Sequence, residues 1–195
     1  MEKLQGKQQA VFIGILGVHS GAGATTMTIT FANYLAGFLG KKVAVYEYGT
    51  KNDFAKIYDS IYGEELGTIG SCFVYESVTY YMKNGVALEN LLNESYDIIL
   101  VDFGSAVILP GEFLRCQHKI VISSMEPWYC GKYEEFCRHL VDYSGSDAWL
   151  HIIGSDSREV KRLKRVYRLM AVERPNISNA YVIDKDLINF FQSLF

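Results

Sequence analysis

Hydrophobic residues in this chain gather in short unbroken runs that alternate with longer segments of helical spacing. Five runs of strand length lie at residues 11–18, 42–48, 96–104, 118–124 and 149–155. Apolar residues recur at helical spacing at residues 25–39, 132–143, 157–170 and 184–195. Continuous apolar strands separated by helices are typical of a parallel sheet that is covered on both sides. The pattern predicts a doubly wound α/β fold, with a mostly parallel sheet and helices on both faces.

The remaining segments are less clearly patterned. Residues 49–94 predict about two short helices and a strand near residues 71–75, and residues 181–183 predict a last short strand. Residues 1–10 read as a polar N-terminal extension. The length suits one compact unit, and the sequence contains neither an internal repeat nor a linker. We therefore expect residues 1–195 to form a single domain.

Composition narrows the class of protein. The formal net charge is −3, and this mild acidity argues against a surface that grips nucleic acid throughout. The four cysteines form no CxxC motif, which favours free thiols in a reducing compartment. No apolar run approaches the roughly 18 residues of a membrane span, and the N-terminal run is too short for a signal-peptide core. We expect a cytoplasmic protein.

The turn between the first strand and the first helix concentrates small residues. Residues 17–26 read GVHSGAGATT. Gly and Ala let backbone N–H groups approach an anion closely, and the start of a helix adds a favourable dipole. Thr25 is placed to offer its hydroxyl to Mg²⁺, and Thr26 to touch an α-phosphate. The segment predicts a phosphate-binding loop, with a tight ligand-free glycine turn as the alternative.

The same segment is similar to the deviant P-loop KGGxGKTT of the MinD/ParA group of ATPases, and within it most resembles the atypical TadZ/CpaE-like members associated with pilus assembly. TITFANYLAGFLGKKVAVYE (residues 28–47) resembles the family's first helix and second strand, and YDIILVDFGS (residues 96–105) its Walker B strand. The resemblance covers about residues 11–124 well. It implies a SIMIBI-like P-loop NTPase fold, ATP or ADP with Mg²⁺ as cofactor, and a homodimer.

Residue by residue, the family motif falls on His19, Ser20, Gly21, Ala22, Gly23, Ala24, Thr25 and Thr26. His19 stands where the family's signature lysine reaches across the dimer, and Ala24 where the P-loop lysine neutralises phosphate charge. Each such cation makes a charge-assisted hydrogen bond worth about 1.5–3 kcal/mol. The Walker A motif is therefore degenerate, and the resemblance predicts weak or atypical nucleotide binding.

Two carboxylates complete the predicted metal site. Asp102 closes the Walker B-like run, so Thr25, Asp102 and Glu47 are the candidate Mg²⁺ residues. In the family the second strand ends with two aspartates, the latter of which positions the attacking water; here the pair falls on Glu47 and Gly49. Glu47 either reaches Mg²⁺ through water or caps a neighbouring loop. Because phosphoryl transfer depends on electrostatic positioning, we expect at most a weak ATPase.

Three weaker features suggest partners. The basic helix at residues 157–170 is a candidate for contact with DNA or an acidic partner, although a solvated outer face is the preferred interpretation. The amphipathic segment 184–195 is expected to dock on the sheet, because it lacks the flanking cations of a membrane-targeting helix. Membrane contact is expected only through partners. Trp128 and Tyr129 are candidates for stacking on a base, packing at an interface or anchoring a loop.

These inferences favour a dimeric localisation or assembly factor that serves a pilus, secretion or positioning system through protein partners. It would bind nucleotide weakly and hydrolyse little or no ATP. The alternative is a pseudo-NTPase scaffold that binds no nucleotide and works only through its partners. A small-molecule kinase or synthetase is the least favoured, because that chemistry depends most on the P-loop lysine.

Overall fold

One sheet of eight strands organises the molecule. The computed structural model describes residues 9–63, 70–83, 85–106 and 108–194, so most of the predicted N-terminal extension lies outside the described residues. The strand order is β3-β4-β2-β5-β1-β6-β7-β8, and every neighbouring pair is parallel except β3 with β4. The strands are β1 Val11–Gly17, β2 Val43–Glu47, β3 Cys72–Tyr75, β4 Val78–Tyr81, β5 Ile98–Ser105, β6 His118–Ser124, β7 Leu150–Gly154 and β8 Met170–Glu173.

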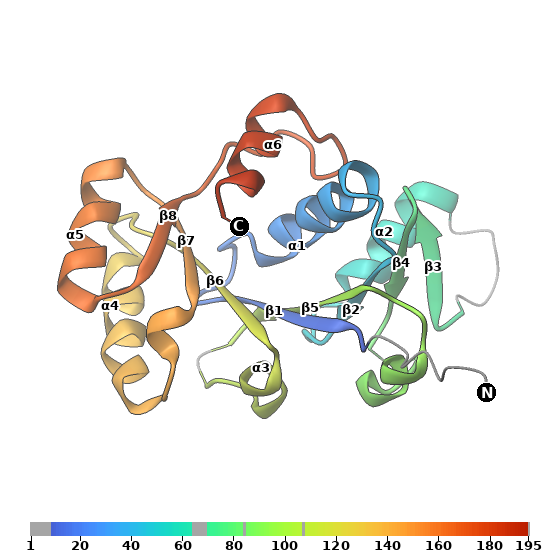
Figure 1. Cartoon of the computed structure of the whole chain (residues 1–195), viewed down its shortest axis with the longest axis horizontal. Helices are drawn as coiled ribbons and strands as arrows, with labels where there is room; N and C mark the ends of the chain where they lie inside the picture. Colours follow the sequence, from blue (N-terminus) through green and yellow to red (C-terminus); the bar gives the residue numbers. More distant parts are fainter. Residues whose placement is uncertain (1–8, 64–69, 84, 107, 195) are drawn as a thin grey trace, which may run out of the picture.

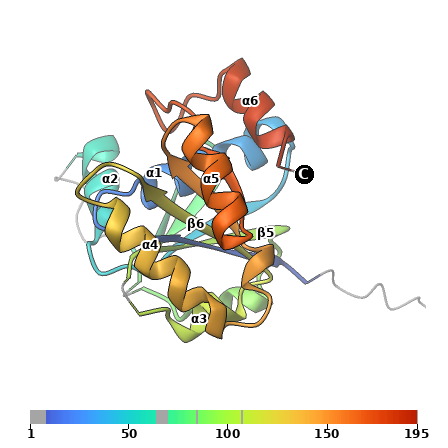
Figure 2. The ribbon, with the colours of Figure 1, turned by 90° about the vertical axis from the view of Figure 1, so that its left-hand side faces the viewer.

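Helices cover both faces of this sheet (Figure 1). One face carries α1 (Ala24–Asn33), α2 (Asp53–Tyr62) and α6 (Lys185–Gln192), which share a hydrophobic cluster with the sheet. The other carries α3 (Gly111–Arg115), α4 (Cys130–His139) and α5 (Ser157–Tyr167). Figure 2 shows α4 and α5 lying side by side on that second face. The predicted doubly wound architecture is confirmed.

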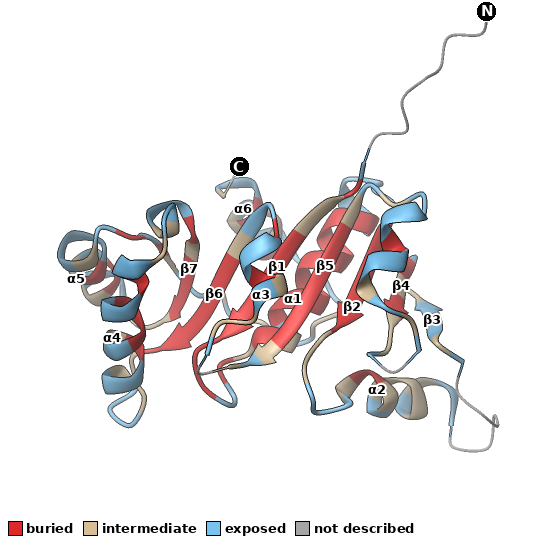
Figure 3. Ribbon diagram, turned by 90° about the horizontal axis from the view of Figure 1, so that it is seen from below, coloured by how far each residue is buried: buried red, intermediate tan, exposed pale blue. Residues whose placement is uncertain are grey.

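The central strands are buried on both faces, as Figure 3 shows for β1, β5 and β6. Alternate side chains of β1 enter opposite clusters: Ile13 and Ile15 pack toward α1, whereas Leu16 packs toward α3 and α4. This two-sided burial explains why the strands appear in the sequence as continuous apolar runs.

Two of the predicted elements differ in the structure. The helix expected at residues 157–170 ends at Tyr167, because Arg168 adopts a left-handed conformation with φ 54°. Met170 therefore begins β8 and is exposed instead of forming the last residue of the helix. The expected strand at residues 181–183 is absent, since these described residues form a turn and an irregular segment.

The middle of the chain contains more strand than the sequence indicated. The strand near residues 71–75 is β3, but it pairs with a second strand, β4, which was not predicted. The two helices of this segment are α2 and a short 3₁₀-helix, Leu88–Asn93. Part of the segment, residues 64–69, lies outside the described residues.

The C-terminal helix packs on α1 and on the π-helix that follows it, Tyr34–Phe38, within the cluster that these helices share with the sheet. The ring of Phe191 lies 5.0 Å from Phe31 and 4.8 Å from Tyr34, measured between centroids. Leu187 and Phe191 are buried there, in agreement with a docked apolar face. Among the helices of the described residues, none is long and apolar enough to cross a membrane.

Close packing around Gly14 of β1 provides a test of this core. A Cβ atom at Gly14 would lie 2.9 Å from Phe113 Cδ2 and 3.0 Å from Cys116 Sγ, closer than packed side chains allow. We expect Gly14→Ala to lower the free energy of unfolding by about 1–3 kcal/mol in urea titrations. The control is Gly131→Ala in α4, where the new Cβ meets no atom within 4 Å beyond its chain neighbours and its own helix backbone. An equal effect of both substitutions would contradict this packing.

Candidate functional site

The predicted site residues meet where three parallel strands end. β5 pairs with both β1 and β2, so the carboxyl ends of these strands lie at one edge of the sheet. The loop after β1, the segment after β2 and the end of β5 therefore converge. Ligands of doubly wound proteins bind at such edges, beside the central strands.

The loop after β1 has the backbone shape of an anion-binding turn. Gly21 and Gly23 adopt left-handed conformations, with φ 79° and 93°, which side chains with a Cβ rarely tolerate. Gly23 is the N-cap of α1 and provides no side-chain hydrogen bond, and the N–H of Met27 is bonded to the Gly23 carbonyl. The N–H groups of the first turn thus lack a side-chain cap and are available to an anion.

An arginine from the far end of the chain holds this loop in place. Arg174 directly follows β8, and its Nη1 donates a hydrogen bond of 2.9 Å to the Ala22 carbonyl. Its guanidinium also lies over Gly154, where a Cβ would approach Nη2 to 3.0 Å. The contact was not predicted from the sequence, because β8, whose first residue was expected to end a helix, was not predicted as a strand.

The His19 side chain is buried against other residues of the same chain. Its ring is 5% exposed and lies flat on Tyr129, with centroids 3.6 Å apart and an interplanar angle of 7°. Its Nδ1 lies 3.1 Å from the Ser20 carbonyl, and its Nε2 has no hydrogen-bond partner among the described residues. A role across a dimer stays a prediction and requires the ring to leave this stack.

Thr25 and Asp102 come together as the predicted metal site requires. Asp102 is 2% exposed, accepts a hydrogen bond of 2.9 Å from the Gly104 N–H and interacts with the Thr25 hydroxyl. Burial raises the pKa of Asp102, an effect that Thr25, Gly104 and the nearby charge of Lys51 oppose. A hydroxyl beside a buried carboxylate provides the oxygen chemistry that Mg²⁺ prefers.

Glu47 caps helix α2. Its Oε1 accepts hydrogen bonds from the backbone N–H groups of Asp53, at 2.5 Å, and Phe54, at 3.3 Å. Burial raises the pKa of Glu47, and these two bonds oppose that rise. The contacts therefore match the capping interpretation, while a role toward Mg²⁺ stays a prediction. Glu47, Thr25 and Asp102 nevertheless line one small cavity of about 60 Å³.

Gly49 leaves this cavity without a further acid at the end of β2. A Cβ on Gly49 would lie 3.5 Å from the backbone of Gly104, which is ordinary contact. A side chain would therefore fit, and its absence is a property of this sequence. No group of three or more His, Cys, Asp or Glu side chains arranged to hold a metal ion occurs within the described ranges.

A larger cavity of about 600 Å³ opens on the other side of the loop, between the end of β5 and α4. Its lining combines apolar and ionisable side chains: Val18, His19, Ser20, Ser105, Ala106, Ile108, Leu109, Lys132, Glu135, Phe136, His139, Leu140, Asp142 and Tyr143. No local pattern in the sequence indicates this cavity, because α4 and the loop are brought together only by the fold.

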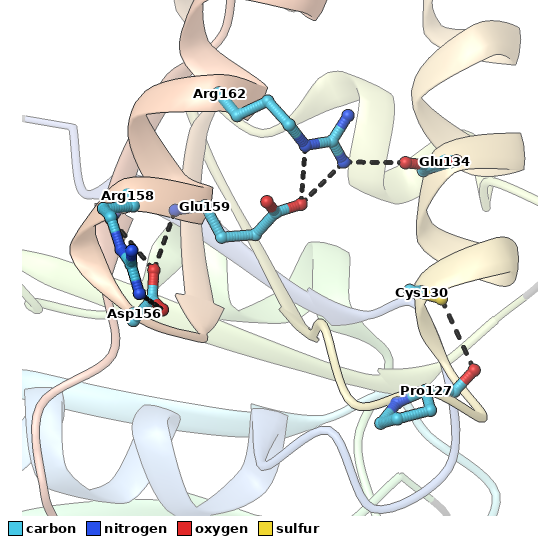
Figure 4. Close-up of polar contacts among 7 residues, drawn as sticks. All are labelled: Pro127, Cys130, Glu134, Asp156, Arg158, Glu159 and Arg162. Carbon is cyan, nitrogen blue, oxygen red and sulfur yellow. Dashed lines mark hydrogen bonds and ion pairs between the residues drawn. The ribbon is translucent and has the colours of Figure 1, made fainter.

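The basic helix α5 is partly neutralised by its neighbours. Figure 4 shows Arg162 between Glu159 of the same helix and Glu134 of α4, with contacts of 2.6 and 2.8 Å. Arg158 lies 3.8 Å from Asp156. The other basic side chains are exposed, namely Lys161, Lys164, Arg165 and Arg168. This arrangement is consistent with a solvated outer face of α5, the interpretation preferred from the sequence. Contact of α5 with DNA stays a prediction.

The chain is similar to known proteins in structure, but no sequence comparison finds a match. A scan against models of protein families finds no match, and neither does a search among curated proteins. Among solved structures, a plasmid partition protein of Borrelia burgdorferi bound to AMPPNP is similar, with a TM-score of 0.66 and 15% identity over 96% of this chain and 100% of that one.

Two structures of MinD are also similar. The MinC:MinD cell division complex of Aquifex aeolicus matches with a TM-score of 0.63 and 16% identity, over 95% of this chain and 90% of that one. The septum site-determining protein MinD of Pyrococcus horikoshii, complexed with Mg-ADP, matches with a TM-score of 0.57 and 16% identity, over 92% and 86%. The chain therefore has the α/β fold of the ParA and MinD P-loop ATPases.

The buried carboxylate of Asp102 predicts a pH-dependent cost to stability. Because its pKa is raised in the folded state, that state binds the proton more tightly, and stability falls as pH rises from the ordinary carboxyl range through the raised value. We expect Asp102→Asn to raise the free energy of unfolding near neutral pH without nucleotide, and to raise it less at about pH 4.5. Urea titrations at both pH values measure this.

The matched control is the exposed Asp147, whose conversion to Asn removes the same charge from the surface. It should change stability little at either pH. A benefit of Asp102→Asn that is equal at both pH values would show that burial of the charge is not its cause.

Proposed function

We propose that this chain is a nucleotide-binding switch of the ParA/MinD type that binds Mg-ATP or Mg-ADP weakly and hydrolyses little ATP. The observation that carries the proposal is the cavity that Thr25 and the buried Asp102 line together beside an uncapped helix start. A loop of uncapped N–H groups suits phosphate, and the hydroxyl and carboxylate suit its Mg²⁺. Similar solved structures that hold AMPPNP and Mg-ADP support the assignment.

Weak binding follows from the absence of a cation within the loop. Ala24 is buried at the start of α1 and offers no charge to a phosphate. A charge-assisted hydrogen bond is worth about 1.5–3 kcal/mol, so its loss lowers affinity by about one to two decades. The carboxylates that line the small cavity add repulsion unless Mg²⁺ is bound with the nucleotide.

Slow hydrolysis follows from the acids at the end of β2. Gly49 provides no carboxylate to position an attacking water, and the Glu47 Oε1 is engaged by the backbone of α2. Phosphoryl transfer is catalysed almost entirely by positioning and charge, so a site with these gaps binds better than it turns over. A switch that is controlled by binding and release of the nucleotide then fits the chain better than rapid ATP hydrolysis.

The proposed switch acts as a homodimer and through protein partners in the cytoplasm, in a positioning, secretion or pilus system like that of the TadZ/CpaE-like proteins. Exposed apolar side chains near the nucleotide edge support a partner surface: Ile108 is 83% exposed and Trp128 68%. Among the similar structures, MinD is seen in complex with MinC. Binding of DNA through α5 is less favoured, because part of its charge is neutralised.

The alternative is a scaffold that descends from a switch and binds no nucleotide. Ala24 favours it, because the residue removes the cation on which phosphate binding usually depends. The two functions differ in a single measurable property, the affinity for Mg-nucleotide.

Calorimetric titration of the purified chain with Mg-ATP and Mg-ADP tests the proposal. We expect micromolar binding that requires Mg²⁺, and we expect Thr25→Ala to weaken it about tenfold or more because the metal loses a hydroxyl ligand. The control is Thr30→Ala in the same helix, whose hydroxyl is bonded to the Thr26 carbonyl at 2.8 Å. That variant should bind like the wild type.

No binding by the wild type would reject the switch. If Ala24→Lys then bound Mg-ATP, the scaffold would be supported, because the fold would have kept the site and lost only its cation. Equal affinity of the wild type and Thr25→Ala would reject the proposed metal geometry.

A further inference from the structure

A lysine that does not belong to the loop touches it. Lys51 lies in the segment between β2 and α2, and its Nζ donates a hydrogen bond of 3.0 Å to the Ser20 Oγ. Ser20 is the second residue of the segment that corresponds to the phosphate-binding motif. The ammonium group therefore reaches the loop from the side of β2, whereas a motif lysine would rise from the start of α1.

The backbone around Lys51 is held against the neighbouring strand. The N–H groups of Tyr48 and Gly49 donate to the Asp102 carbonyl, at 2.8 and 3.1 Å. At the other end of the segment, Glu47 holds the first N–H groups of α2. A segment of this length that is fixed at both ends places Lys51 at little further entropic cost.

The ammonium group of Lys51 is not engaged in an ion pair with any described residue. Within the described part of the chain it makes no salt bridge, although the residues lining the small cavity include Glu47, Asp53 and Asp102. Asp53 is instead paired with Lys56, at 2.8 Å. Lys51 is the only cationic residue in that lining. Its present partner is a neutral hydroxyl, which an anion of the same loop can replace with a stronger, charge-assisted bond.

Arg174 also lies beside the loop, but its guanidinium is already bonded to the loop backbone. Its Nη1 is engaged with the Ala22 carbonyl, and its guanidinium lies against Gly154. It fixes the shape of the loop, whereas Lys51 carries a charge that is free to turn toward a ligand.

We infer that Lys51 supplies the positive charge that this loop lacks at Ala24, so that the phosphate-contacting cation of the site comes from the segment after β2. The inference rests on the proposed function, in which the loop binds Mg-nucleotide. On binding, the ammonium group leaves the Ser20 hydroxyl and contacts the terminal phosphates of the nucleotide. Since only Asn52 separates Lys51 from α2, phosphate binding is thereby linked to the position of that helix.

Calorimetry with Mg-ATP on charge variants of Lys51 tests the inference. We expect Lys51→Gln to weaken binding about 10- to 100-fold, because glutamine keeps a donor for Ser20 and loses the charge. Lys51→Arg should retain most of the affinity. The matched control is Lys56→Gln, a nearby exposed cation that pairs with Asp53, and it should change affinity less than about twofold.

A charge-transfer variant sharpens the test. Combining Lys51→Gln with Ala24→Lys moves the cation back into the loop, and we expect it to restore the affinity that Lys51→Gln loses. All of the Lys51 and Lys56 substitutions lie at exposed positions, so thermal unfolding should show folded proteins.

The outcomes separate the two claims. If the wild type binds Mg-ATP and Lys51→Gln binds as well as Lys56→Gln, the role of Lys51 is overturned while the proposed function stands. If the wild type does not bind Mg-ATP at all, the proposed function fails and this inference fails with it.

Discussion

The structure depends on the parallel pairing of β1 with β5 on one side and β6 on the other. This pairing satisfies the backbone of β1 along both of its edges while helices cover its two faces, and it places the end of β1 next to Asp102. Gly17 follows from the same constraint, because a Cβ there would lie 3.1 Å from the Gly104 carbonyl. The loop, the metal-type residues and the segment after β2 are brought together by these backbone contacts before any side chain of the site takes part.

At the carboxyl ends of β2 and β5, buried carboxylates that destabilise the fold when ionised have few cations near them. Burial raises the pKa of both Asp102 and Glu47, so each carboxylate lowers stability when ionised. The hydrogen bonds by which Glu47 caps α2 offset part of this loss of stability. The contacts of Asp102 with Thr25 and Gly104 do the same. An ionised Asp102, buried three residues before the end of β5, lowers stability unless a cation compensates its charge. This cost supports the proposed Mg²⁺ beside Asp102.

The sequence predicted the central strands because two-sided burial leaves an apolar run, and it predicted the loop because Gly21, Gly23 and Thr25 have a recognisable spacing. It missed β8, a four-residue strand with both ends exposed that only Arg168 and Leu169 separate from α5. It also missed the contacts of Lys51 and Arg174, which join residues 31 and 152 positions apart. Such contacts depend on how strand ends meet, and no local pattern encodes them.

The central claim is that this loop binds a nucleotide although its own lysine is missing. A crystal structure grown with excess Mg²⁺ and AMPPNP tests it most directly. The account predicts the triphosphate along the N–H groups of residues 20–26, Mg²⁺ beside Thr25 and Asp102, and the Lys51 ammonium turned from Ser20 to the phosphates. An empty loop under these conditions, with Lys51 still bonded to Ser20, would contradict it.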